Sequence, residues 1–221
     1  FIARYRKEVT GALDDEVLRN LDERLRYLRN LEEKKEQVLS SIREQEKLTP
    51  ELERQIQSAA TLVAVEDLYR PYRPKRRTRA TIAQEKGLGP LADAIALQMM
   101  KEPLEEAARA YVSEEKGVAS PEDAIAGAGD ILAERISDEA KYRTYIRNLT
   151  LKQGSIQSAA KDEKAESVYE MYYNYEETIR KAAGHRVLAL NRGEKEKILS
   201  VKVAAPEEDI IRYLEKQVIT R

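Results

Sequence analysis

The sequence has no cysteine, and its 221 residues include only nine glycines and seven prolines. Without cysteine there is no disulfide framework, thiolate metal cluster or cysteine nucleophile. No apolar run approaches the roughly 20 residues that cross a bilayer, and the first residues lack the hydrophobic core of a signal peptide. We therefore expect a soluble, cytoplasmic protein without membrane contact, large enough for one large domain or a main domain with a smaller insert.

Aromatic residues are also scarce, at 6%, whereas charged residues make up 36% of the chain. This balance is typical of a helix-rich protein and unlike that of a β sandwich. Lys and Arg (39) nearly equal Asp and Glu (40), so any case for nucleic-acid binding must rest on local clustering of charge. The chain starts without Met and ends within a charged helix, and we expect it to be a piece of a longer protein.

Hydrophobic periodicity predicts a mainly α fold that begins with a long helix over about residues 14–47. Its apolar stripe, with spacings of three and four, consists of Leu18, Leu21, Leu25, Leu28, Val38 and Ile42. Thr49-Pro50 predicts a capped restart of the chain as a short helix. Further helices are expected near residues 65–69, 81–86, 90–100, 103–112, 120–136, 142–149, 166–173, 176–182, 185–194 and 206–218.

Strand-like alternation is limited to two stretches, Ser155–Ala159 and Ile198–Val203. We therefore expect at most a small two-stranded β ribbon beside the helices. Small residues between Ala124 and Gly129 suit close approach by a neighbouring helix, and we interpret them as packing residues.

The most informative stretch is residues 70–79, where two prolines stiffen a run of cations with no acidic residue among them. The candidate nucleic-acid-binding residues are Arg70, Arg73, Lys75, Arg76, Arg77 and Arg79. In a rigid segment, guanidinium groups could meet phosphates, and the nearby tyrosines could stack on bases. Equally, these cations could pair with carboxylates of neighbouring helices or of a domain outside this chain.

The other polar groups do not form a catalytic or metal-binding constellation. His185 has neither a nucleophile nor a second histidine near it in the sequence, so a cap or packing role is the simpler interpretation. Acidic pairs such as Glu207-Glu208 fall in helical first turns or charged helix faces, and the tyrosines between Tyr169 and Tyr175 are interpreted as core. We expect no enzyme, metal or cofactor.

Three segments, in this order, resemble the Tex family of bacterial transcription accessory proteins. They are FIARYRKEVTG at residues 1–11, EDLYRPYRPKRRTRATIA at 66–83 and HRVLALNRGE at 185–194. The resemblance covers essentially the whole chain. Two departures are Arg70, where an aliphatic residue is usual, and Ala12, where a glycine is usual.

The resemblance implies a nucleic-acid-associated protein whose N-terminal half is a multi-helical bundle with a helix-turn-helix-like insert. It places the insert at residues 48–115, between the long helix at 1–47 and the rest of the larger helical region at 116–221. A ribonuclease-H-like domain, helix-hairpin-helix elements and an RNA-binding barrel would follow in the longer protein. Expected partners are RNA or DNA, these downstream domains and the transcription machinery; the alternative is a protein or interdomain docking scaffold whose nucleic-acid binding lies in the downstream domains.

Overall fold

The computed structural model describes residues 2–220, so Phe1 of the first Tex-like segment lies outside it. The chain divides into two compact units. Unit one contains the chain up to Arg76 and returns for Asp138–Ala140, and unit two contains Arg77–Ser137 and the chain from Lys141 onward. The expected mainly α fold is confirmed, and in this part of the chain no helix is long and apolar enough to cross a membrane.

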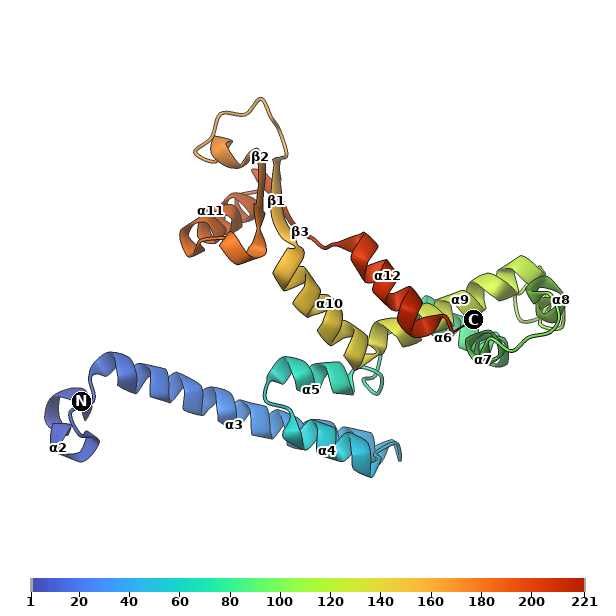
Figure 1. The fold of residues 1–221 in the computed structure, drawn as a ribbon, viewed down its shortest axis with the longest axis horizontal. Coiled ribbons are helices and arrows are strands. Elements are labelled where there is room, and N and C mark those ends of the chain that lie inside the picture. The colour runs from blue at the N-terminus through green and yellow to red at the C-terminus, as the bar shows by residue number, and fades with distance from the viewer. Residues whose placement is uncertain (1, 221) are drawn as a thin grey trace. The chain divides into compact units, whose positions relative to one another are not determined.

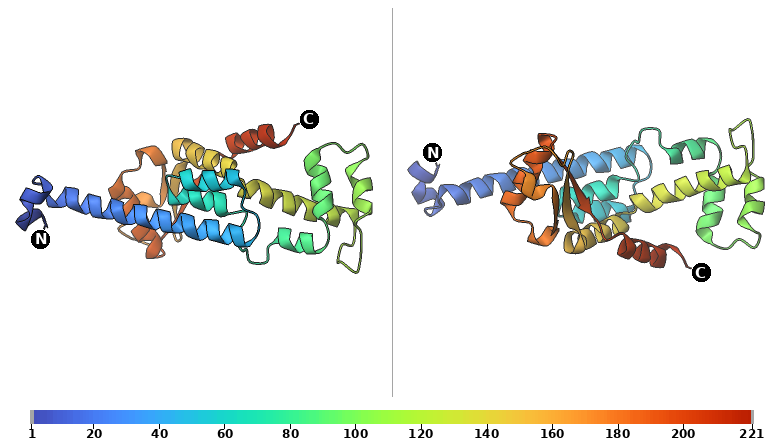
Figure 2. Two further views of the ribbon diagram at one scale, coloured as in Figure 1. Left: turned by 90° about the horizontal axis from the view of Figure 1, so that it is seen from below. Right: turned by 90° about the horizontal axis from the view of Figure 1, so that it is seen from above.

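Unit one is built on one long helix, α3 (Asp15–Glu44), as the periodicity predicts. Two short helices, α1 (Ile2–Tyr5) and α2 (Lys7–Thr10), precede it, and α4 (Pro50–Ser58) and α5 (Leu62–Tyr69) follow. Side-chain oxygens of Asp14, Thr49 and Thr61 accept hydrogen bonds from the first turns of α3, α4 and α5, so each helix begins at a residue that suits an N-cap. Figures 1 and 2 show α4 and α5 lying along the second half of α3.

The core of unit one lies where these three helices meet, and it covers only the second half of the predicted stripe. Its buried side chains are Leu31, Val38, Ile42, Leu52, Ile56, Ala59 and Val65. Lys35 is buried among them, and its ammonium group donates to Glu32 and to the backbone oxygen of Gln57 at the end of α4. In contrast, Leu21 and Leu25 in the first half of α3 are exposed.

The backbone before α3 explains why a glycine would suit position 12. Gly11 and Ala12 both have positive φ angles, +64° and +67°. A glycine adopts this left-handed conformation freely, whereas alanine pays a steric cost for its Cβ. Ala12 therefore holds a strained turn between α2 and α3.

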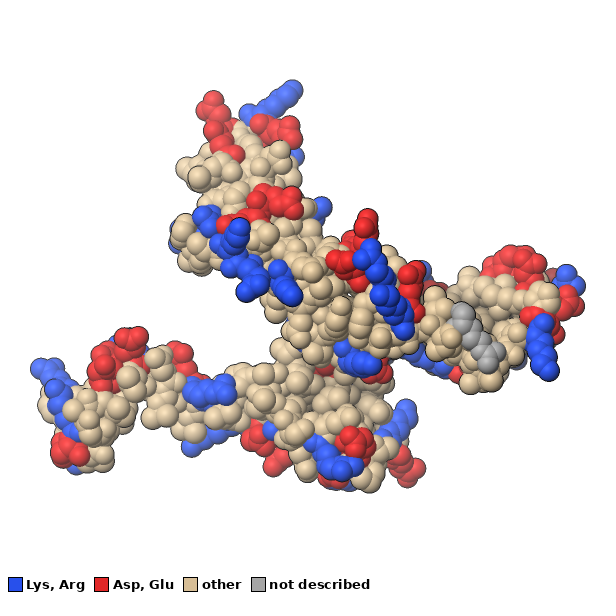
Figure 3. Space-filling view, viewed as in Figure 1, with Lys and Arg blue, Asp and Glu red and all other residues tan. Residues whose placement is uncertain are grey.

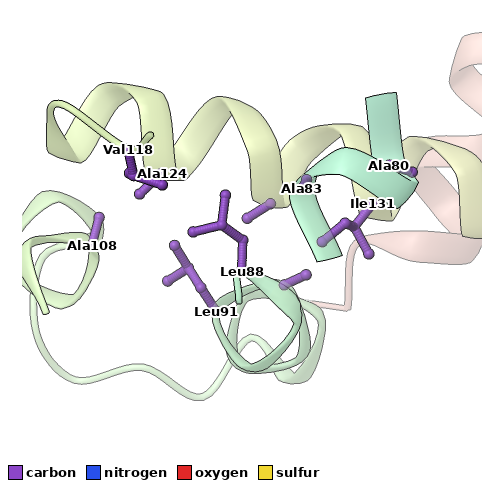
Figure 4. Close-up of a cluster of buried hydrophobic side chains, with 10 residues drawn as sticks. Ala80, Ala83, Leu88, Leu91, Ala108, Val118, Ala124 and Ile131 are labelled. Atoms are coloured by element: carbon purple, nitrogen blue, oxygen red, sulfur yellow. The ribbon is translucent and has the colours of Figure 1, made fainter. Parts of the chain in front are cut away.

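Unit two begins with short helices that pack on one longer helix. They are α6 (Arg79–Glu85), α7 (Gly89–Leu97), α8 (Leu104–Arg109) and α9 (Pro121–Asp138), followed by α10 (Ala140–Gln153). Gly87, with φ +83°, follows α6 as the sequence predicts. Figure 4 shows Leu88 and Leu91 pointing into a core that Ala124 and Ile131 of α9 close.

Small residues on α9 make this packing possible. Ala124 and Ala128 are fully buried, and a Cβ added to Gly127 would collide with the side chain of Leu88. Gly129, in contrast, faces open space. The packing interpretation of this stretch is therefore confirmed for Gly127 and not for Gly129.

The second half of unit two contains a three-stranded antiparallel sheet with the order β2-β1-β3. Strands β1 (Ser155–Ala160) and β3 (Leu199–Ala204) are the two predicted stretches, and β2 (Asn174–Thr178) is a third. The prediction of at most a two-stranded ribbon is therefore wrong, because the sheet has a third strand, β2. Residues 176–182, predicted as a helix, instead end β2 and form the 3-10 turn η2 (Ile179–Lys181), because β1 offers β2 a pairing partner distant in sequence.

One face of the sheet packs on α11 (Gly184–Lys195) and on the turn η1 (Glu170–Tyr172). Tyr169 and Tyr172 are buried there with Leu190 and Leu199, which confirms the tyrosines as core. Burial raises the pKa of Tyr169, and so does the hydrogen bond that its hydroxyl donates to Glu196.

The final helix, α12 (Glu207–Val218), contacts α10 through aromatic rings. The rings of Tyr145 and Tyr213 stack with centroids 3.6 Å apart, and Tyr142 meets Tyr213 edge to face. Gln98, which follows α7, donates to the backbone oxygen of Val218 at the end of α12.

Ile42→Ala should lower the free energy of unfolding by about 2–5 kcal/mol, because its side chain is fully buried in the core of unit one. Leu21→Ala on the same helix removes a side chain that is 56% exposed and should change the value by less than about 0.5 kcal/mol. Chemical denaturation followed by circular dichroism measures both. Equal losses would show that another surface covers the first half of α3.

Gly127→Ala should destabilise the chain by about 1–3 kcal/mol, because the added methyl group has to displace the buried Leu88 side chain. Gly129→Ala, two residues along α9, is the matched control. Its Cβ meets nothing, so the gain in helix propensity should stabilise the chain by about 0.5–1 kcal/mol. The same sign of effect for both variants in thermal denaturation would contradict the packing.

Candidate nucleic-acid interface

Residues 70–79, here called the basic segment, join the end of α5 to the start of α6. Its start is a tight turn in which the backbone N–H groups of Tyr72 and Arg73 both donate to the oxygen of Tyr69. The side chain of Gln45, which follows the last residue of α3, donates to the oxygen of Tyr72 at 2.9 Å and ties this turn to the end of α3. Residues up to Arg76 belong to unit one and those from Arg77 to unit two.

Two of the six candidate cations converge on one carboxylate. Arg70 donates through Nε to Oδ1 of Asp138 at 2.9 Å, and the ammonium group of Lys75 binds Oδ2 of the same residue. Asp138 is only 6% exposed. A carboxylate removed from water to this extent needs opposite charges close by. We infer that Arg70 and Lys75 bind the Asp138 carboxylate rather than a ligand.

The other two cations of unit one are less engaged. Arg73 lies 3.9 Å from Glu66, at the limit of an ion pair, and the Arg73 side chain is largely exposed whereas Glu66 is half-buried. Arg76 is exposed and forms no ion pair within residues 2–220. Of the candidate residues in unit one, Arg76 is therefore the best placed to meet an external anion.

In unit two, Arg77 and Arg79 flank the start of α6. Arg77 pairs with Glu85 at 2.7 Å and Arg79 with Asp130 at 3.5 Å, and the two arginine side chains are 68% and 86% exposed. Ion pairs this exposed contribute about 0–1 kcal/mol, so a phosphate could replace either carboxylate. Thr78 between them accepts a hydrogen bond from the N–H of Thr81 and caps α6.

The sequence located the basic segment but missed the residue that organises it. Asp138 lies 63 residues after Lys75. No local pattern marks this carboxylate as a partner, because the contact depends on how the chain folds back. Phosphate binding by the six candidate residues stays a prediction.

The remaining polar candidates lie apart from one another. His185 is exposed in the first turn of α11, and Glu207 and Glu208 occupy the first turn of α12. Within the described residues, no group of three or more histidine, aspartate and glutamate side chains could hold a metal ion.

Two family profiles match the chain. The Tex-like protein N-terminal domain matches residues 1–43, and the Tex central region-like family matches residues 99–220. Together they cover both ends of the chain, and the second alone covers more than half of it.

Named relatives match nearly the whole chain. The transcriptional accessory protein Tex of Neisseria gonorrhoeae is 42% identical over 212 residues, which is 95% of this chain and 28% of the relative. Protein YdcI of Bacillus subtilis is 52% identical over 99% of this chain and 31% of its own length. A human protein, S1 RNA-binding domain-containing protein 1, is 29% identical over 92% of this chain and 21% of its own length. The chain thus spans about a third or less of these relatives.

Asp138→Asn should lower the free energy of unfolding by about 1–3 kcal/mol, because it weakens the charged hydrogen bonds of Arg70 and Lys75 to a buried group. Glu85→Gln removes the carboxylate of the exposed Arg77 pair and is the control, with an expected loss below about 1 kcal/mol. Thermal and urea denaturation report both values. If the two variants lost the same stability, Asp138 would not hold the basic segment.

Proposed function

Because the chain belongs to the Tex family, we propose that it is a helical scaffold of a transcription accessory protein and that its basic segment acts mainly as a brace within unit one. The observation that carries this is the buried carboxylate of Asp138, which engages Arg70 and Lys75 together. Two cations whose charges are paired with a buried carboxylate stabilise the fold and are less available to a polyanion, although the Arg70 side chain is 46% exposed. We assign no catalytic residue to the chain.

The names of the relatives support a nucleic-acid context for this scaffold. One is named as a transcriptional accessory protein and another for an S1 RNA-binding domain. Since the chain spans only 21–31% of the relatives' lengths, parts of the longer protein beyond this chain have room for the principal nucleic-acid contacts. The scaffold would then dock those parts and other proteins of the transcription machinery.

A second function is supported by the exposed end of the basic segment. Arg76 has no carboxylate partner among residues 2–220, and Arg77 and Arg79 are held only by exposed ion pairs. Guanidinium groups of this kind suit contacts to backbone phosphates without sequence selectivity. The brace and the phosphate contact make opposite predictions for charge reversal.

If the basic segment acts as a brace, the double variant Arg76→Glu, Arg77→Glu should bind RNA or DNA with nearly unchanged affinity. The affinity of the 221-residue chain should change by less than about twofold at low salt. The control is Arg19→Glu with Arg26→Glu, which changes the net charge equally on the exposed face of α3. Fluorescence anisotropy across a salt series measures both pairs.

Phosphate contact would instead weaken binding about tenfold or more in the Arg76 and Arg77 variant alone. The slope of log affinity against log salt would also become shallower by about 1.8 on duplex DNA, since each phosphate contact contributes about 0.9. A weaker affinity together with a shallower salt slope would reject the brace and support phosphate contact as the function of the basic segment.

A further inference from the structure

Two long stretches outside the basic segment are free of acidic residues. Residues 140–161 contain five cations and residues 178–193 contain four, with no Asp or Glu in either stretch. In a chain with 40 acidic residues and a net charge of −1, such stretches concentrate positive charge locally. The first includes α10 and β1, and the second includes η2 and most of α11.

Strand pairing in unit two brings the two stretches together. Gly154 separates α10 from β1, and its backbone oxygen accepts a hydrogen bond from the N–H of Ile179, where η2 begins. A Cβ at Gly154 would lie 2.5 Å from the oxygen of Thr150, so only glycine allows β1 to start directly after the helix. Lys152 in the last turn of α10 and Arg180 in η2 therefore lie at the same end of the β1–β2 pair.

The resulting cluster consists of Lys152, Arg180 and Lys181, and all three residues are exposed. None of its three members forms an ion pair with a described residue. The nearest acidic residue in the sequence, Glu177, already accepts hydrogen bonds from Arg186 at 2.5 Å and from Tyr175. Figure 3 shows Lys and Arg side chains gathered over η2 and the adjoining end of α10.

Hydrogen bonds connect the elements that carry the cluster. Arg186 on α11 also donates to the backbone oxygen of Lys181, which fixes η2 to the helix that follows it. Glu176, the other carboxylate of β2, accepts from Ser155 and Gln157 on β1, and these bonds lower its pKa. Both carboxylates near the cluster are thus held by the sheet and α11.

We propose that Lys152, Arg180 and Lys181 form a contact surface for the phosphate backbone of a nucleic acid. The inference rests on the proposed function, because it assigns to this scaffold a direct contact with the polymer on which the longer protein would act. It differs from that function in its location, which is the junction of α10 and η2 and not the basic segment.

The chemistry of the cluster favours a polyphosphate chain over an acidic protein. One guanidinium and two ammonium groups on a helix end and a turn can meet several phosphates, which a nucleic acid presents at every nucleotide. The proposed contacts go to backbone phosphates, which carry no sequence information, so the contact should lack sequence selectivity. Both RNA and DNA offer this backbone, and the experiment has an arm for each.

The test measures binding of the 221-residue chain to labelled single-stranded RNA, single-stranded DNA and duplex DNA by fluorescence anisotropy at about 50 mM salt and above. The triple variant Lys152→Glu, Arg180→Glu, Lys181→Glu should bind at least about tenfold more weakly to every probe that the unmodified chain binds, with a shallower salt dependence. The control triple variant reverses exposed cations that already have carboxylate partners, Arg19, Arg26 and Arg54.

The control should lose less than about threefold, because it changes the net charge by the same amount at sites away from the cluster. Circular dichroism melting checks that both variants fold. If the reversal variant melts early, the neutral variant Lys152→Gln, Arg180→Gln, Lys181→Gln replaces it, with the same expected direction of effect.

Three results would overturn the inference: no binding by the unmodified chain at low salt, equal losses in the two triple variants, or displacement of nucleic acid by polyglutamate at equal charge concentration. The last would identify an acidic protein as the partner. None of these affects the brace, which is tested separately by the stability of Asp138→Asn and by reversal of Arg76 and Arg77. A preference for one probe assigns RNA or DNA.

Discussion

The ion pairs of Asp138 with Arg70 and Lys75 determine how unit one is completed. The chain leaves this unit after Arg76 and returns to it only at Asp138, the last residue of α9. A buried carboxylate cannot remain ionised at low cost without opposite charges, so the return point and the basic segment stabilise each other. Arg70, one of the two departures from the Tex-like pattern, is a direct partner in this contact.

Positive charge has two different surroundings in this chain. In the basic segment, five of the six cations face carboxylates, and only Arg76 lacks one among residues 2–220. At the junction of α10 and η2, the cations gather where nearby carboxylates are already bound to the sheet or to α11. A high density of arginine in a sequence therefore identifies a positively charged segment. Whether its cations are free to bind an external anion depends on carboxylates that are distant in the sequence.

The helices were predictable because their signals are local. Periodicity and caps such as Asp14 and Thr49 located α3 and α4 closely. Strand β2 was missed because its residues carry no strong strand pattern and depend on pairing with β1, about 20 residues earlier in the chain. The cations of the candidate site could be located because they are neighbours in the sequence. Their partner Asp138 could not be predicted, because it lies 63 residues after Lys75.

The tyrosine environments give the chain a built-in optical reporter. There is no tryptophan among its 221 residues, so its ultraviolet emission comes from twelve tyrosines. The hydroxyls of Tyr169 and Tyr175 donate to the carboxylates of Glu196 and Glu177, and Tyr145 is stacked on Tyr213. Hydroxyl–carboxylate bonds and ring stacking both quench phenol emission. Emission from these four tyrosines, all in unit two, should therefore be weak in the folded chain and increase on denaturation.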